Sequence, residues 1–299
     1  MGILQWLRRS LGGHRASPPP VAQPARPEQP DAEQHEAPAP AVSPDPADPV
    51  EADAPEEFAE VEPNEAGLPA ALRPASRLHQ PAWKGRFEST CARLSEHAYD
   101  LVWIGDSCVQ QFERAGRKDF LNYAPIWNRY YKPRNAINLG FAGDDTSNLL
   151  WRLENGHLAY PSAKAVVLLI GTNNVNRPKF TPEDTASAIA RIAGMMADRL
   201  PDAEIVVLSM WPNGRGAETN LLQMDVNTRL APKLQQMARV RFVDVSGIFM
   251  KDGEVDLSKF RDPLQTPPQM AIHPSAAAQA EIAERLEPIM EEIFGTLAD

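Results

Sequence analysis

Short apolar runs alternate with longer helical patterns along the last two-thirds of the chain. The runs are rich in β-branched residues and cover residues 100–107, 136–140, 165–174, 204–210 and 241–246. Helical periodicity opens near Ser147 and fills residues 183–200, 218–237 and 275–294, and Thr181 followed by Pro182 is typical of a helix start. The longest runs are continuous rather than alternating, as in strands buried on both faces. The pattern predicts an α/β fold, with three α/β/α layers around a doubly wound, mostly parallel sheet of about five strands.

The first quarter of the chain has a different composition. Fifteen of the 29 prolines lie between Pro18 and Pro74, and thirteen acidic residues but no Lys or Arg lie between Arg26 and Arg73. Such a segment cannot bury enough apolar surface to offset its ordering entropy, so residues 16–77 are predicted to be a disordered Pro/Ala/Glu-rich acidic linker. Residues 78–299 form the predicted folded domain.

The net charge of −10 belongs mainly to this linker. Without its thirteen acids, 27 acidic residues remain against 30 basic ones. The folded part is therefore nearly neutral, and no nucleic-acid partner is expected. Cys91 and Cys108 show neither metal-ligand spacing nor a disulfide framework.

Residues 1–15 form a short basic amphipathic segment. Ile3, Leu4, Leu7 and Leu11 share one helical face, and basic residues lie beside them. The segment lacks the features of a secretory signal, and no run is long enough to span a membrane. It predicts either a peripheral contact with a membrane or protein partner, or a frayed terminus. The expected location is cytoplasmic, or peripheral at the inner membrane.

Four residues lie where the predicted strands end or where the last helix begins: Ser107, Gly143, Asn173 and His273. In parallel sheets these ends meet at one edge. Ser107 opens a helix, where its N–H can face a developing oxyanion; Gly143 permits close backbone approach, and Asn173 offers an amide donor. Each residue alone is more often a turn or cap residue than a reactive group. Their order and placement together favour a site.

The blocks around these residues resemble the SGNH, or GDSL-type, hydrolases. The resemblance runs from about Tyr99 to Phe294 and is carried by "WIGDSCVQQF", "INLGFAGDDTSNLLWRLENG", "VVLLIGTNN" and the final His block. Within that family the chain is most similar to the group of the intracellular platelet-activating-factor acetylhydrolase catalytic subunits. The resemblance implies a flavodoxin-like SGNH hydrolase fold that uses no metal or cofactor.

The resemblance also implies a role for each of the four residues. Ser107 would be the nucleophile and His273 the general base that activates it. The N–H groups of Ser107 and Gly143 and the amide of Asn173 would form the oxyanion hole.

The acid of the triad is missing from its usual place, because the family's last block reads Asp-x-x-His and Met270 stands where that Asp belongs. Three alternatives stay open: a Ser–His dyad, substitution by Asp262 on the approach to His273, or a degraded site that binds without turnover. The dyad is slightly favoured, because His273 lies eleven positions after Asp262, with three prolines between them.

The predicted function is that of a serine esterase that removes short acyl groups, above all O-acetyl, from a small ester, with a carbohydrate or polysaccharide among the candidate substrates. An acyltransferase using the same site is one alternative. A catalytically weak binding or scaffold subunit of a membrane-associated envelope or exopolysaccharide assembly is another. The sequence leaves the oligomeric state open.

Overall fold

The computed structural model describes residues 67–160 and 162–297, all within one compact unit, Glu60–Asp299. The predicted amphipathic segment 1–15 and residues 16–66 of the predicted linker lie outside the described residues.

A five-stranded parallel sheet forms the centre of the domain, as predicted from the apolar runs. The strand order is β2-β1-β3-β4-β5, and every neighbouring pair is parallel. The strands are β1 Leu101–Gly105, β2 Ala136–Gly140, β3 Ala165–Leu169, β4 Glu204–Leu208 and β5 Val240–Val243. The order reverses between β1 and β3, so the ends of these two strands flank the crevice in which ligands bind in such folds.

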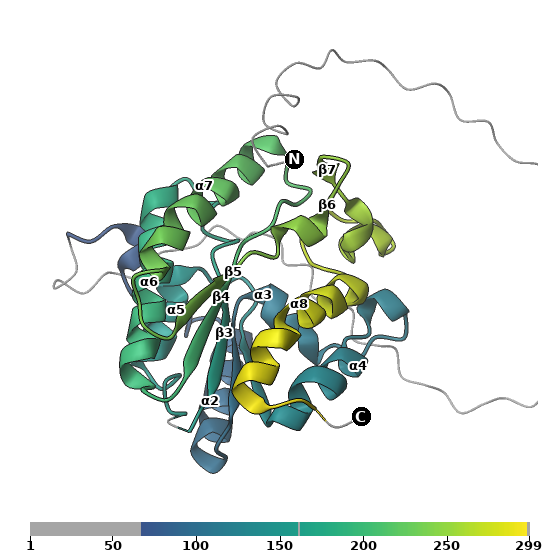
Figure 1. Cartoon of the computed structure of the whole chain (residues 1–299). Coiled ribbons are helices and arrows are strands. Elements are labelled where there is room, and N and C mark those ends of the chain that lie inside the picture. Colours follow the sequence, from purple (N-terminus) through teal and green to yellow (C-terminus); the bar gives the residue numbers. More distant parts are fainter. Residues whose placement is uncertain (1–66, 161, 298–299) are drawn as a thin grey trace, which may run out of the picture. The chain divides into compact units, whose positions relative to one another are not determined.

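Two apolar cores lie on opposite faces of this sheet. Alternate residues of β1 divide between them: Val102 and Ile104 join one core, whereas Leu101 and Trp103 join the other. This division explains why the strands are apolar without a break. Figure 1 shows α5, α6 and α7 along one side of the strands and α4 and α8 along the other, which confirms the three-layer α/β/α fold.

The four predicted helices lie close to their predicted positions, whereas helix α2, Pro81–Glu96, was not predicted. Thr181 caps α6 by accepting a hydrogen bond from the Asp184 N–H at 3.1 Å. Ser275 caps α8 in the same way through the Ala278 N–H, so Pro274 lies before the cap and not in the first turn. Among the described residues, the helices of four residues or more are α2 Pro81–Glu96, α3 Ser107–Gln110, α5 Thr146–Glu154, α6 Pro182–Arg199, α7 Ala217–Leu234 and α8 Ala276–Phe294, together with the π-helix Trp127–Tyr131 and the 3-10 helix Ser246–Phe249.

Several shorter elements complete the described chain. They are α4 Ala124–Ile126, the two-residue strands β6 Met250–Lys251 and β7 Glu254–Val255, and the three-residue 3-10 helices Ala70–Leu72, Gln111–Glu113, Asp119–Leu121, Lys132–Arg134, Leu257–Lys259 and Asp262–Leu264. Within the described chain, no helix has the length and apolar character needed to cross a membrane.

Residues 67–77 differ from the prediction that places them in the linker. Ala71 is fully buried, and its carbonyl accepts a hydrogen bond from the Thr146 hydroxyl at 2.9 Å. Ala75 makes two hydrogen bonds to the start of α5: its N–H donates to the Ser147 carbonyl, and its carbonyl accepts from the Asn148 side chain. The high proline content concealed this contact, because Pro is compatible with an extended segment that packs on a domain. The folded domain therefore includes residues before Leu78.

Candidate active site

The turn between β1 and α3 places Ser107 at the carboxyl edge of the sheet. Gly105 fits here because a Cβ at this position would lie 1.9 Å from the Leu169 carbonyl oxygen of the neighbouring strand. Asp106 then caps α3, and its buried carboxylate accepts a hydrogen bond from the Cys108 N–H at 2.9 Å. Burial raises the pKa of Asp106 to about 7.

His273, which lies just before the last helix, faces Ser107. Its Nε2 lies 3.0 Å from the Ser107 Oγ, although 166 residues separate the two. Tyr123 holds the following residue, donating its hydroxyl hydrogen bond to the Pro274 carbonyl at 2.7 Å. Gln279 of α8 donates to the Cys108 carbonyl, which ties the helix after His273 to the helix that carries Ser107. The structure thus brings together the predicted nucleophile and the predicted base.

Asp262 supports His273 from the other side of the imidazole. Its Oδ1 lies 3.0 Å from the His273 Nδ1, while Oδ2 accepts backbone hydrogen bonds from Ile272 and His273 at 2.8 and 2.6 Å. Met270, at the position of the family's acid, has a side chain that is 56% exposed. This geometry is that of the Asp262 alternative and differs from the dyad that the sequence slightly favours.

A short antiparallel pairing explains how Asp262 reaches His273. Arg261 N–H donates to the His273 carbonyl at 2.9 Å, and Ser275 N–H donates to the Lys259 carbonyl at 2.8 Å. These bonds place the start of the loop opposite its end, so the ten residues between Asp262 and His273, three of them prolines, form a closed turn. Burial acts to raise the pKa of Asp262, but the hydrogen bond and charge of His273 and the two backbone N–H groups together lower it below the usual value. The carboxylate is therefore ionised at neutral pH.

Two of the three predicted oxyanion donors, Gly143 and Asn173, lie after the ends of β2 and β3. Gly143 follows β2 in a left-handed conformation, φ +76°, which glycine adopts readily. The Asn173 side chain donates one of its amide hydrogens to the Asp144 carbonyl at 2.9 Å, which ties the loop after β3 to the Gly143 turn. Among the described residues, no hydrogen-bond acceptor is found for the N–H of Ser107 or of Gly143. Both groups are therefore available to a ligand.

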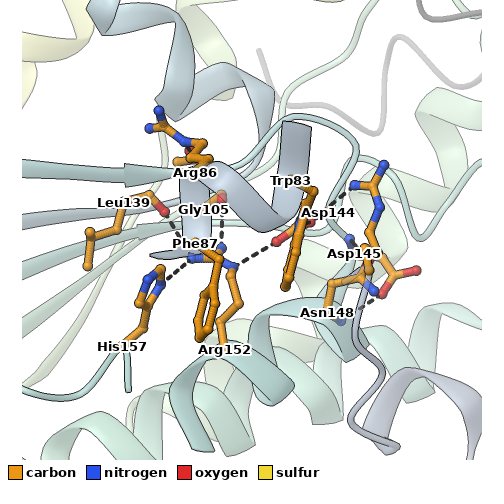
Figure 2. Close-up of polar contacts among 12 residues, drawn as sticks. Trp83, Arg86, Phe87, Gly105, Leu139, Asp144, Asp145, Asn148, Arg152 and His157 are labelled. Atoms are coloured by element: carbon orange, nitrogen blue, oxygen red, sulfur yellow. Dashed lines mark hydrogen bonds and ion pairs between the residues drawn. The ribbon is translucent and has the colours of Figure 1, made fainter. Parts of the chain in front are cut away.

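A buried ionic network beneath the Gly143 turn was not singled out from the sequence. The Asp144 carboxylate is fully buried and accepts hydrogen bonds from Arg152 Nε at 2.8 Å and Trp83 Nε1 at 2.7 Å. Figure 2 shows Arg152 between Asp144 and His157, with its remaining N–H groups directed at the carbonyls of Leu139 and Gly105. The network connects the ends of β1 and β2 to α5.

His157 is a neutral member of this network. Arginine has only donors, so the His157 Nδ1, 2.9 Å from Arg152 Nη1, must accept, and Nε2–H donates to the Thr90 hydroxyl at 2.8 Å. Burial lowers the pKa of His157 well below its usual value, and the nearby Arg152 charge acts in the same direction. The sequence signal for this buried network was Arg152 in the apolar stretch "LLWRL", which is separated by three residues from the acidic pair Asp144 and Asp145. Among the described residues, no group of three or more His, Cys, Asp and Glu side chains is placed to hold a metal ion.

Comparison with known proteins assigns the chain to one family. The sequence pattern of the GDSL-like lipase/acylhydrolase family matches residues 103–281. The chain belongs to this family. As a GDSL-like acylhydrolase it is an ester-hydrolysing enzyme, and the matched range contains all four residues singled out from the sequence as well as Asp262.

Relatives within the GDSL-like family extend over most of the chain. Platelet-activating factor acetylhydrolase IB subunit alpha2 of Rattus norvegicus is 31% identical over 232 residues, covering 76% of this chain and 92% of the relative. The alpha1 subunit of the same enzyme from Homo sapiens is 33% identical over 221 residues, covering 69% of this chain and 90% of the relative. Among solved structures, a GDSL-like lipase from Bacteroides thetaiotaomicron superposes with a TM-score of 0.53 at 14% identity, covering 69% of this chain and 97% of that one. This structural likeness shows the shared fold.

Proposed function

We propose that this GDSL-like acylhydrolase removes short acyl groups, above all acetyl, from an alcohol oxygen through an acyl-enzyme on Ser107. The observation that carries the proposal is the hydrogen-bonded series from Ser107 Oγ through His273 to Asp262, with 3.0 Å at each step. A serine hydroxyl is a weak nucleophile until an adjacent base takes its proton, and here that base is within hydrogen-bonding reach.

The reaction would proceed in two halves. Ser107 Oγ attacks the acyl carbonyl carbon while His273 Nε2 takes the hydroxyl proton, and the carbonyl oxygen becomes an oxyanion. The N–H groups of Ser107 and Gly143 and the second amide hydrogen of Asn173 stabilise that charge; removing one such donor typically costs about 3 to 4 kcal/mol. The intermediate collapses, and the alcohol leaves with the proton from His273. Water then repeats the attack, with His273 again as base, and releases the acid.

Asp262 has a positioning role in this scheme. Its Oδ1 accepts the Nδ1–H of His273, which fixes the tautomer whose Nε2 can take a proton. The two backbone hydrogen bonds to Oδ2 keep the carboxylate from turning away. Because Asp262 stays ionised, it also stabilises the imidazolium that forms during attack.

The acyl preference rests on the relatives. The rat alpha2 and human alpha1 relatives, at 31% and 33% identity, are named acetylhydrolase subunits, which supports a small acyl group. A carbohydrate alcohol stays a prediction, as does transfer to an alcohol instead of water. The scaffold alternative loses support, because Ser107 is only half-buried and is hydrogen-bonded to a supported imidazole.

Turnover of a p-nitrophenyl ester series tests the proposal. We expect acetyl and propionyl esters to be hydrolysed at least ten-fold faster than the octanoyl ester, judged by kcat/KM. Ser107→Ala is the control and is expected to reduce every rate to background. A preference for the octanoyl ester would contradict the small acyl group, and equal rates for wild type and Ser107→Ala would contradict the role of Ser107.

A further inference from the structure

An arginine from outside the predicted domain lies directly on the Gly143 turn. Arg77 Nη1 donates to the Ala142 carbonyl at 2.8 Å and to the Asp144 carboxylate at 3.2 Å. A Cβ built on Gly143 would meet the two Nη atoms at 2.8 and 2.9 Å. The guanidinium thus contacts the residues on both sides of Gly143 and covers Gly143 itself.

The backbone that carries Arg77 is fixed at both ends. Before it, the segment is fastened to α5 through Ala71 and Ala75. After it, the Arg77 carbonyl accepts from the Gln80 N–H at 2.9 Å, and α2 begins at Pro81. Trp83 of α2 then reaches the same Asp144 oxygen that Arg77 contacts. The guanidinium therefore approaches the turn from a rigid support.

The Gly143 turn needs such a support for the proposed reaction. A left-handed glycine has few steric restrictions, so its own backbone does not hold the N–H in one direction. The Asp144 carboxylate is held by Arg152, and the Asp144 carbonyl is held by Asn173. Arg77 adds its contacts to Ala142 and Asp144, with a side chain that is 15% exposed.

We propose that Arg77 is a positioning residue for the oxyanion hole: by binding Ala142 and Asp144 together it holds the Gly143 N–H toward the oxyanion. This inference rests on the proposed function, because it assigns the same hole to the same reaction. It makes residues 70–77 part of the active-site scaffold. A donor displaced by about 1 Å can cost roughly a hundred-fold in rate, which sets the expected size of the effect.

Steady-state kinetics of Arg77→Met, Arg77→Lys and Arg73→Met on p-nitrophenyl acetate test the inference. Arg73 is the matched control, since it lies in the same segment and its side chain has no hydrogen-bond or ion-pair partner among the described residues. We expect Arg77→Met to lower kcat about 30- to 100-fold with KM changed less than three-fold, because the lost interaction acts in the transition state. Arg77→Lys keeps the charge but lacks the planar guanidinium that bonds both partners through Nη1 and covers Gly143, so an intermediate loss is expected. Arg73→Met should stay within two-fold of wild type.

Hydrogen exchange of a peptide covering residues 140–146 provides a readout that does not depend on turnover. Exchange there is expected to be faster in Arg77→Met and unchanged in Arg73→Met. If Arg77→Met fails to fold, Arg77→Lys carries both measurements. Wild-type kcat in Arg77→Met, or a rise in KM alone, would overturn the positioning role. If the wild type itself has no ester turnover, the proposed function fails, and unchanged exchange at residues 140–146 would then overturn the positioning role separately.

Discussion

Replacing Asp262 with asparagine is expected to lower kcat by about a thousand- to ten-thousand-fold on any ester that the enzyme hydrolyses. The asparagine would keep an oxygen for the backbone N–H groups of Ile272 and His273, so the loop should fold as before. Its amide nitrogen would then face His273 Nδ1 and favour the tautomer with the proton on Nε2. That tautomer cannot accept the Ser107 proton, and no carboxylate would stabilise the imidazolium. KM should change little, because Asp262 acts through His273.

Substitutions at Met270 are the matched control for Asp262→Asn. Met270 occupies the position of the family's acid, but its side chain is largely exposed. We expect Met270→Ala to leave kcat within two-fold of wild type. A nearly silent Asp262→Asn, or a large gain from Met270→Asp, would contradict the assignment of Asp262 and restore the dyad. Pre-steady-state acylation rates measure the effect most cleanly, since they report the step in which His273 acts as base.

Replacing Arg152 with methionine is expected to lower the free energy of unfolding by roughly 3 to 5 kcal/mol. The substitution leaves the fully buried Asp144 carboxylate with only Trp83 and the longer contact to Arg77. It also removes donors from the carbonyls of Leu139 and Gly105, which are strand-end groups next to the site. Urea denaturation followed by intrinsic fluorescence measures the loss.

Two further variants test whether the loss of stability comes from the uncompensated buried charge of Asp144 and not simply from the loss of an ion pair. Arg152→Met combined with Asp144→Asn should recover part of the loss, because it removes the uncompensated buried charge. Arg229→Met is the surface control, since Arg229 pairs with Glu183 and Asp225 on the exposed side of α7 and such pairs contribute little. An Arg152→Met variant as stable as Arg229→Met would contradict a structural role for the network.

The strands and most long helices were predictable because burial on both faces leaves a local signature. Val102, Trp103 and Ile104 are apolar in sequence because neighbouring side chains enter opposite cores. Helix α2 was not predicted, because only Trp83, Thr90 and Leu94 of its sixteen residues are buried. So few buried positions give no periodic apolar stripe.

Some residues of the candidate site were likewise predictable from the sequence, and others were not. The placement of Ser107, Gly143 and Asn173 at one edge was predictable because a parallel sheet gathers its strand ends there, whereas His273 was singled out by its place before the last helix and by the resemblance to the SGNH hydrolases. The position of Asp262 beside His273 was not predictable, because it depends on the backbone pairing of Arg261 with His273. That pairing leaves no pattern in the sequence.

Arg77 and Arg152 were missed for another reason. A single charged residue normally indicates a solvated face, and only the fold shows which carboxylate it meets. Both arginines contact Asp144, although Arg77 lies 67 positions before it in the chain and Arg152 lies 8 positions after it.

The central claim, that Ser107 is a nucleophile activated by His273, is tested most directly by intact-mass analysis after treatment with a fluorophosphonate probe. The expected result is a single covalent adduct on the wild type, no adduct on Ser107→Ala and strongly slowed labelling of His273→Ala. Equal labelling of wild type and Ser107→Ala, or no labelling of the wild type under conditions that label a reference serine esterase, would contradict it.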